Sequence, residues 1–238
     1  MSDFISGLSA GLVSTFVCNP FDVIRTNMQV NRNYISNYKF SYLYRGIFHG
    51  IITIPFYWSF YFHFYGKFKK YNQTKLSFIN GYLAANISST LTCPLWFIRQ
   101  KSLTNETFNF INHYKKYGIK PFYNGLSSTY IINLSFIIQM PLYENLKQNT
   151  KLNELIKNDT FKIFLITSFS KTLSLYLVYP VDTIRTIKRN DYNITYINII
   201  KNLNKSPTMY FAGFGVYLIR SIPYQTTIFC TYEYLKKN

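Results

Sequence analysis

The chain has 238 residues, enough for one large domain or two small ones, and its 26 Lys and Arg outnumber 9 Asp and Glu to give a net charge of +17. Such a charge implies an anionic partner: nucleic acid, an acidic lipid surface or a small anionic substrate. However, 48% of the residues are hydrophobic and 20% are aromatic. This composition argues against a solvated nucleic-acid-binding arm.

Four stretches of 18 to 23 residues contain no charged side chain: 4–21, 46–66, 76–98 and 121–143. A helix needs roughly 20 such residues to cross a bilayer core of about 30 Å. The stretches also contain Ser, Thr, Asn, Gly and His, and the mean hydropathy of the chain is only −0.03. Polar residues in membrane helices usually face a cavity inside the bundle. The alternative is a soluble, all-helical protein with buried helices.

A motif of proline, acid and base recurs along the chain. It occurs at 20–25 (Pro, Asp, Arg) and at 180–185, and an altered copy at 94–99 has Trp96 in place of the acid. Aromatic-x-glycine follows each copy and ends at Gly46, Gly125 or Gly213, and YENLK and YEYLK close the second and third copies. The order predicts one domain (1–238) of three tandem repeats, about 1–72, 73–150 and 151–238, each with two long helices. Pro20, Pro94 and Pro180 are expected to kink the first helix of each repeat.

These markers resemble those of the mitochondrial carrier family. The resemblance covers the chain from about Ser6 to Lys236, and the proline motif is the most specific part of it. It implies an all-α membrane protein with six transmembrane helices, in three two-helix repeats around a central cavity. It also implies a transporter rather than an enzyme.

The resemblance assigns a matrix gate to the charged residues of the motifs and to a bracing glutamine: Asp22, Arg25, Arg99, Asp182, Arg185 and Gln29. Asp22 is expected to pair with Arg99, and Asp182 with Arg25. Arg185 has no expected partner from the motif, because Trp96 replaces the acid. Two rings of ion pairs that form in alternation would make a bistable element that a ligand can bias.

The closing markers imply a second ring, the cytosolic gate: Lys69, Glu144, Lys147, Glu233 and Lys236. Glu144 is expected to pair with Lys236, and Glu233 with Lys69. Gly66 takes the position of an acid and leaves Lys147 without its expected partner.

Two basic residues lie within the expected fifth and sixth helices, Lys171 and Arg220. Lys171 precedes Asp182 by 11 residues, about three helical turns, so both lie on nearly one face. Arg220 resembles the arginine at the third substrate contact point of adenine nucleotide carriers, and its planar fork suits phosphate or carboxylate.

Arg220 follows Gly213, and the same spacing after Gly46 and Gly125 places the first two contact points at Thr53 and Ile132. Alignment from the closing markers shifts these two positions by about one residue. Ile132 and Asn133 carry no charge, which argues against amino-acid and keto-acid carriers and loosely fits the nucleotide pattern. Phe136 could stack on a base, or it could pack between helices.

The predicted function is exchange of nucleotides, of the ADP/ATP type or deoxynucleotides, across the mitochondrial inner membrane by a monomer in alternating access. No cofactor, metal or nucleic acid is expected, and the partners are membrane lipid and a small anion. Cardiolipin is expected as a bound lipid at the backbone of Gly46, Gly125 and Gly213. Alternatives are a carrier for another phosphate-bearing anion or nucleotide-containing cofactor, and a non-exchanging channel or scaffold.

The chain is rich in Ile, Asn, Lys, Tyr and Phe, which is typical of translation from an AT-rich genome. A parasite or an amoebal giant virus would fit this composition. For a virus, the inner membrane would be that of the host cell.

Overall fold

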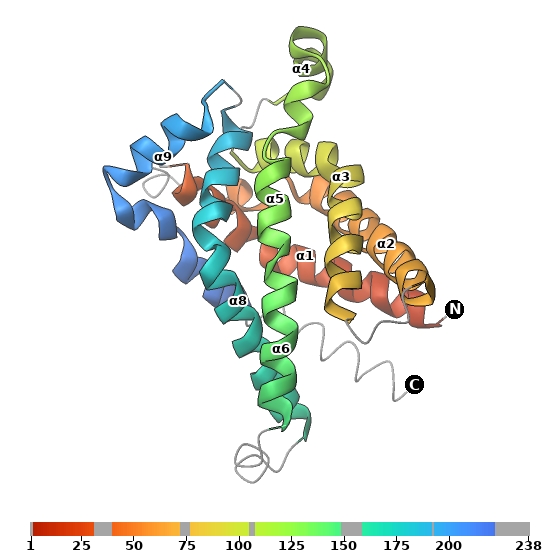
Figure 1. Cartoon of the computed structure of the whole chain (residues 1–238). Helices are drawn as coiled ribbons and strands as arrows, with labels where there is room; N and C mark the ends of the chain where they lie inside the picture. Colours follow the sequence, from red (N-terminus) through yellow and green to blue (C-terminus); the bar gives the residue numbers. More distant parts are fainter. Residues whose placement is uncertain are drawn as a thin grey trace.

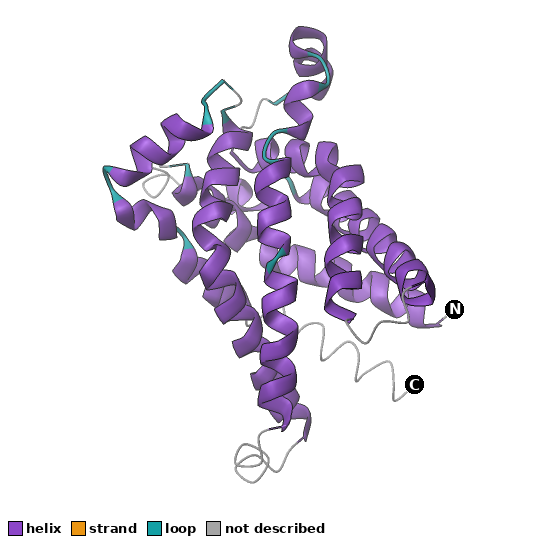
Figure 2. Cartoon of the chain, viewed as in Figure 1, coloured by secondary structure: helices purple, strands orange, loops and turns teal. Residues whose placement is uncertain are grey.

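The structure is a computed structural model that describes residues 2–30, 40–71, 77–104, 108–148, 159–191 and 193–221. All regular elements in these ranges are helices (Figure 2). In chain order they are α1 (Ser2–Gln29), η1 (Phe40–Tyr44), α2 (Ile47–Tyr71), α3 (Ser77–Thr104), α4 (Phe110–Tyr117), η2 (Lys120–Tyr123), α5 (Leu126–Asn133), α6 (Ser135–Gln148), α8 (Asp159–Asn190), α9 (Tyr196–Asn204) and η3 (Pro207–Phe211). A last helical segment covers 214–221.

One order of elements occurs three times in the described residues. A long helix (α1, α3 or α8) carries the proline motif, a short 3₁₀ helix follows later, and a glycine of positive φ then begins the next helix. The φ angles are 66° at Gly46, 76° at Gly125 and 76° at Gly213. A residue with a side chain rarely adopts this backbone, so the glycines fix the turn into each second helix.

The same three glycines connect the units in a closed cycle. A Cβ atom at Gly46 would lie 3.3 Å from Leu103 of α3, and one at Gly125 would lie 3.0 Å from Cγ of Arg185 in α8. At Gly213 it would lie 3.1 Å from the backbone oxygen of Arg25 in α1. Each unit therefore packs its glycine turn against the long helix of the next unit, and the third packs against the first.

Replacement of Gly125 by alanine is therefore expected to destabilise the fold. The left-handed backbone costs a residue with a side chain about 1–3 kcal/mol, and the new methyl group would press on Arg185. Gly66→Ala is the matched control, because Gly66 lies inside α2 with nothing within 4 Å. That control is expected to be neutral or stabilising, by about 0.5–1 kcal/mol. Thermal unfolding in detergent measures both, and equal melting temperatures would contradict the expectation.

In the long helices some polar side chains are fully buried while some large apolar side chains are exposed. In α8, Ser170 and Ser174 are fully buried, whereas Phe169 and Leu177 are each 58% exposed. In α3, Thr92 is fully buried and its neighbour Leu91 is 50% exposed. Polar groups inside and large apolar groups outside fit a bundle whose surroundings are lipid.

One helix in the described residues, Phe161–Asn190 of α8, is long and apolar enough by length and composition to cross a membrane. Within the described residues none of the four uncharged stretches meets this criterion, so their reading as membrane spans stays a prediction. The physical reason is that a stretch without charge is not necessarily apolar: Ser, Thr and Asn lower its hydropathy. Six membrane crossings remain a prediction.

The stretch 121–143, expected as one helix, forms two. α5 ends at Asn133 and α6 begins at Ser135, and Figure 1 shows α5 and α6 nearly in line. The N–H of Leu134 donates to the carbonyl oxygen of Ile131, three residues earlier, at 3.1 Å. This is the bond of a 3₁₀ helix, whose turn is tighter than that of an α-helix. The break therefore lies at the expected second contact point.

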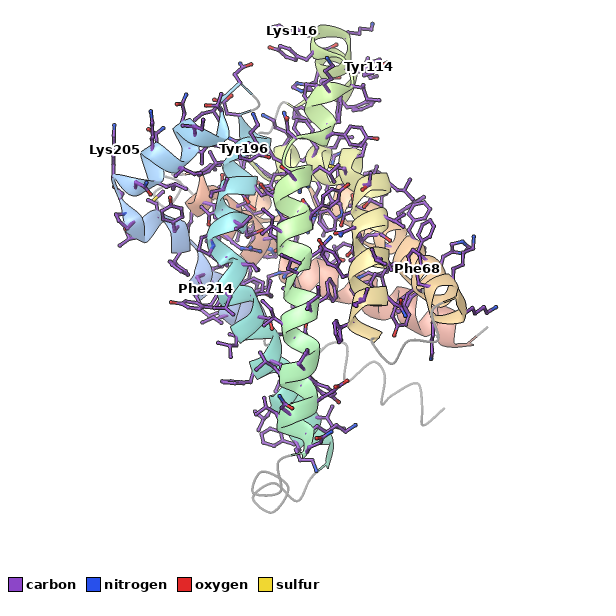
Figure 3. All side chains as sticks on the ribbon, in the orientation of Figure 1. Phe68, Tyr114, Lys116, Tyr196, Lys205 and Phe214 are labelled. Atoms are coloured by element: carbon purple, nitrogen blue, oxygen red, sulfur yellow. The ribbon has the colours of Figure 1, made fainter. Side chains whose placement is uncertain are left out.

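The loop helices α4 and α9 lie at one end of the bundle (Figure 1). Figure 3 shows Tyr114 and Lys116 near the outer end of α4, and Lys205 just beyond α9. Asn109 caps α4 by accepting from the N–H groups of Ile111 and Asn112. Basic side chains at this end suit an anionic bilayer surface.

Candidate substrate cavity and gate

A central cavity of about 420 Å³ lies between the long helices. Its walls combine basic, aromatic and neutral polar side chains from α1, α2, α3, α5, α6, α8 and the segment 214–221. The lining residues are Thr15, Asp22, Ile54, Tyr57, Trp58, Trp96, Arg99, Ile132, Asn133, Ser135, Phe136, Gln139, Lys171, Leu175, Tyr217 and Arg220. A cavity of this size and lining can hold a small organic anion.

Five of the six predicted substrate-binding residues line this cavity: Ile132, Asn133, Phe136, Lys171 and Arg220. Thr53 does not. It is 1% exposed, and its neighbour Ile54 lines the cavity instead. Spacing along a chain does not fix which side of a helix faces a cavity, and substrate contact at Thr53 stays a prediction.

Arg220 has a contact that the sequence did not predict. Its Nε atom lies 2.8 Å from Oδ1 of Asp22, and Oδ2 of Asp22 accepts a hydrogen bond from Nη2 of Arg99 at 2.9 Å. One carboxylate on α1 therefore holds two arginines from two other helices. The arginine expected to bind substrate therefore contacts Asp22, a residue of the expected matrix gate.

The two ion pairs expected in the matrix gate are both present as contacts. Asp22 pairs with Arg99, and Asp182 pairs with Arg25 through Nη2. These pairs join α1 to α3 and α8 to α1. Their role in gating is a prediction.

Arg25 is held by groups that the sequence analysis missed. Its Nε donates to the hydroxyl of Tyr179 at 3.3 Å, and its guanidinium lies 5.2 Å and 4.9 Å from the ring centroids of Tyr179 and Tyr217. Gln29 also reaches this point, because its amide donates to Oδ2 of Asp182 at 3.1 Å. The signal for Tyr179 was its place directly before the motif proline, and a chain with 23 Tyr gave no reason to select it.

The structure corrects the expectation for Arg185. Its guanidinium pairs with Oδ1 of Asp182, three residues earlier in the same helix. Trp96, which replaces the missing acid, lies in the central cavity with its ring centroid 5.4 Å from the guanidinium carbon of Arg99. Asp182 therefore serves Arg25 and Arg185 at once, because Trp96 offers no carboxylate across the junction between α3 and α8.

Lys69, Glu144 and Lys147 of the expected cytosolic gate are exposed. Lys147 lies 5.9 Å from the ring centroid of Tyr143, its neighbour one turn away. Glu233 and Lys236 lie outside the described residues. The expected pairs Glu144–Lys236 and Glu233–Lys69 are therefore not among the contacts described.

Of the three glycines expected to bind cardiolipin, Gly46 lies at a wide groove of about 550 Å³ together with Arg45 and Ser102. Gly125 and Gly213 pack closely on Arg185 and Arg25. Free N–H groups at the start of α2 and the charge of Arg45 make the groove at Gly46 suitable for a phosphate head group.

Comparison with known families bears on the same residues. A family model described as mitochondrial carrier protein matches residues 1–42 and 157–238, which contain the first and third motifs. The chain belongs to the mitochondrial carrier family. The match thus covers the two motifs that retain the acid, and the altered motif with Trp96 lies outside it.

Relatives in the family are distant. Mitochondrial substrate carrier family protein W of Dictyostelium discoideum is 26% identical, over 69% of this chain and 57% of its own length. Solute carrier family 25 member 33 of Homo sapiens is 27% identical, over 63% of this chain and 54% of its own. The chain thus spans little more than half the length of these relatives. An uncharacterized mitochondrial carrier of Schizosaccharomyces pombe is 24% identical over 98% of this chain and 95% of its own.

These three names mention no nucleotide, and none of the three relatives is viral. Their names describe mitochondrial carriers and a solute carrier. They give no support to ADP/ATP-like specificity or to a viral origin.

Proposed function

We propose that this chain exchanges nucleotides, or another anion that bears phosphate, across the mitochondrial inner membrane by alternating access. The observation that carries the proposal is that Lys171 from α8 and Arg220 from the segment 214–221 line the central cavity, beside Arg99 of the gate. They share the cavity with the uncharged pair Ile132 and Asn133. Two basic side chains, combined with an uncharged second contact point, favour a substrate with several negative charges over an amino acid.

The shared carboxylate offers a way for the substrate to act on the gate. Asp22 holds Arg220 and Arg99 together. A phosphate group that takes the guanidinium of Arg220 would remove one of the two partners of Asp22. Substrate binding would thereby weaken the contact between α1 and the segment 214–221. A ligand can shift a conformational equilibrium only if it interacts differently with the two conformations, and this competition for Arg220 would be such a difference.

Phe136 is the proposed base-stacking residue. Its ring lines the central cavity and also stacks on Tyr61, with the centroids 6.0 Å apart and the planes at 21°. It therefore packs between helices and reaches the cavity at the same time. Stacking of a base on an aromatic side chain contributes about 1–3 kcal/mol.

Cardiolipin is proposed as a bound lipid at the groove of Arg45 and Gly46, where the chain combines a base with a helix N-terminus. The proposed active form is a monomer, because the cavity is enclosed by helices of one chain.

The test is uptake into liposomes that contain cardiolipin and the purified protein. Labelled ADP, ATP and dATP are offered outside, with and without unlabelled nucleotide inside. Uptake that requires internal nucleotide is the expected result for an exchanger. Inorganic phosphate is offered in parallel as a substrate of the same charge class.

Other outcomes would change the proposal in defined ways. Uptake of phosphate without uptake of any nucleotide would overturn the nucleotide assignment and keep a phosphate carrier. Uptake that is indifferent to internal substrate would favour a non-exchanging channel, for which the missing ion pair at Trp96 is the structural argument.

A further inference from the structure

A second, smaller pocket of about 160 Å³ lies beside the central cavity, with which it shares Tyr57, Trp96 and Asn133. We call it the side pocket. Its other lining residues are Ser89, Thr129, Arg185 and Arg189. It lies at the junction of α3, α5 and α8, where the sequence lacks the acid of the second motif.

Arg189 is buried in this pocket, and no carboxylate of the described residues lines it. It is 4% exposed, its Nε donates to the carbonyl oxygen of Asn124 at 3.3 Å, and its Nη2 donates to Oγ1 of Thr129 at 3.2 Å. The sulfur of Cys93 lies 3.9 Å from Nη2. In the described part of the chain these partners are all neutral. A buried cation without an ion pair of its own is costly, because neutral hydrogen-bond partners offset little of its lost hydration.

Within the described ranges, the charged residues near Arg189 form ion pairs with one another and not with Arg189. Arg185, one turn before Arg189, pairs with Asp182, and Asp182 also pairs with Arg25. Arg25 and Arg185 thus share one carboxylate, and no ion pair of Arg189 occurs among the described residues. At the equivalent junction between α1 and α3, Asp22 of the first motif meets Arg99 directly. The difference is Trp96, whose ring stands where the second motif would otherwise present its acid.

We propose that the side pocket binds a phosphate-type oxyanion between Arg185 and Arg189, in place of the carboxylate that Trp96 removes. Guanidinium groups match the geometry of phosphate oxygens, and two of them from one helix face can grip one group. The hydroxyl groups of Ser89 and Tyr57 line the same space. The bound oxyanion supplies the negative charge at the junction of α3 and α8. At the other two junctions, between α1 and α3 and between α8 and α1, side-chain carboxylates supply it.

The oxyanion has two possible sources: free inorganic phosphate, and the terminal phosphate of a nucleotide in the central cavity. Both use the same chemistry, because the two spaces share a wall. Binding of inorganic phosphate does not depend on the proposed transport of nucleotides. The site can therefore be tested without any transport assay.

The experiment is equilibrium dialysis of the purified protein in detergent against labelled inorganic phosphate, at constant ionic strength set with sodium chloride so that screening is matched. Wild type is expected to bind phosphate saturably. Arg189→Gln should bind it about ten- to 100-fold more weakly, which corresponds to the loss of one charged hydrogen-bonding group. Glutamine is a conservative choice, because Gln29 has the same place nine residues after the first motif proline.

Trp96→Asp is the second variant, and it covers the possibility that Arg189→Gln does not fold. It restores an acid to the second motif, so phosphate binding should be lost while thermal stability is kept or raised. Lys171→Gln is the control for phosphate in the central cavity, because Lys171 lines that cavity and not the side pocket. It should leave the Arg189-dependent binding in place.

No saturable binding to wild type, or equal binding to wild type, Arg189→Gln and Trp96→Asp, would overturn the proposal. Competition then identifies the source of the oxyanion. Displacement of labelled phosphate by ADP, but not by adenosine, is expected if the nucleotide places its terminal phosphate in the side pocket. Simultaneous binding of ADP and phosphate is expected if the pocket holds a separate ion.

Discussion

Asp182→Asn is expected to abolish transport and to lower the thermal stability of the protein more than Arg220→Ala does. The side chain of Asp182 is 6% exposed and pairs with Arg25 and Arg185, and Gln29 donates to it at 3.1 Å. Removal of one partner from a buried ion pair costs about 3–5 kcal/mol, because the other charge stays buried. Here two arginines would lose their carboxylate.

Asp191→Asn is the matched control for this prediction. Asp191 follows α8 directly, is exposed, and accepts a hydrogen bond from the N–H of Asn193. The same chemical change there is expected to leave uptake and the melting temperature close to wild type. Thermal unfolding in detergent and liposome uptake measure both variants. Equal effects of the two substitutions would show that the buried pairs do not support the fold.

Arg220→Ala is expected to have the second largest effect, a loss of transport by a factor of 100 or more. Truncation removes a proposed phosphate ligand and leaves Asp22 with Arg99 as its remaining ion-pair partner within the described residues. The lost contact to phosphate and the lost ion pair with Asp22, at about 1.4 kcal/mol each, correspond to a factor of roughly 100. Uptake of labelled ADP at a series of concentrations measures the rate and the apparent affinity.

Arg220→Lys separates the two roles of this residue. Lysine keeps the charge near Asp22 and lacks the planar fork, so thermal stability should recover more fully than affinity for a phosphate-bearing substrate. Wild-type rate and affinity in Arg220→Ala would show that Arg220 does not bind substrate. An equal loss of stability and affinity in both variants would assign it to the fold alone.

The sequence and the family resemblance together were sufficient to name two contacts between residues far apart in the chain, Asp22 with Arg99 and Asp182 with Arg25, and the structure contains both. They were accessible because the motif recurs in fixed order, and a recurring motif places equivalent residues at equivalent points of a symmetric bundle. Ile54 lines the cavity and Thr53 does not, since a count along the chain does not fix the rotation of a helix about its axis.

By itself the sequence determined the helical repeats, the positions of the motif prolines and glycines, and the absence of an acid at Trp96. Only the tertiary structure showed that each of these acids serves a second arginine. Asp22 is shared by Arg99 and Arg220, Asp182 is shared by Arg25 and Arg185, and Arg189 is buried among neutral groups. The physical reason is that an ion pair requires its charged atoms within about 4 Å, and for atoms on separate helices that distance depends on how the helices pack.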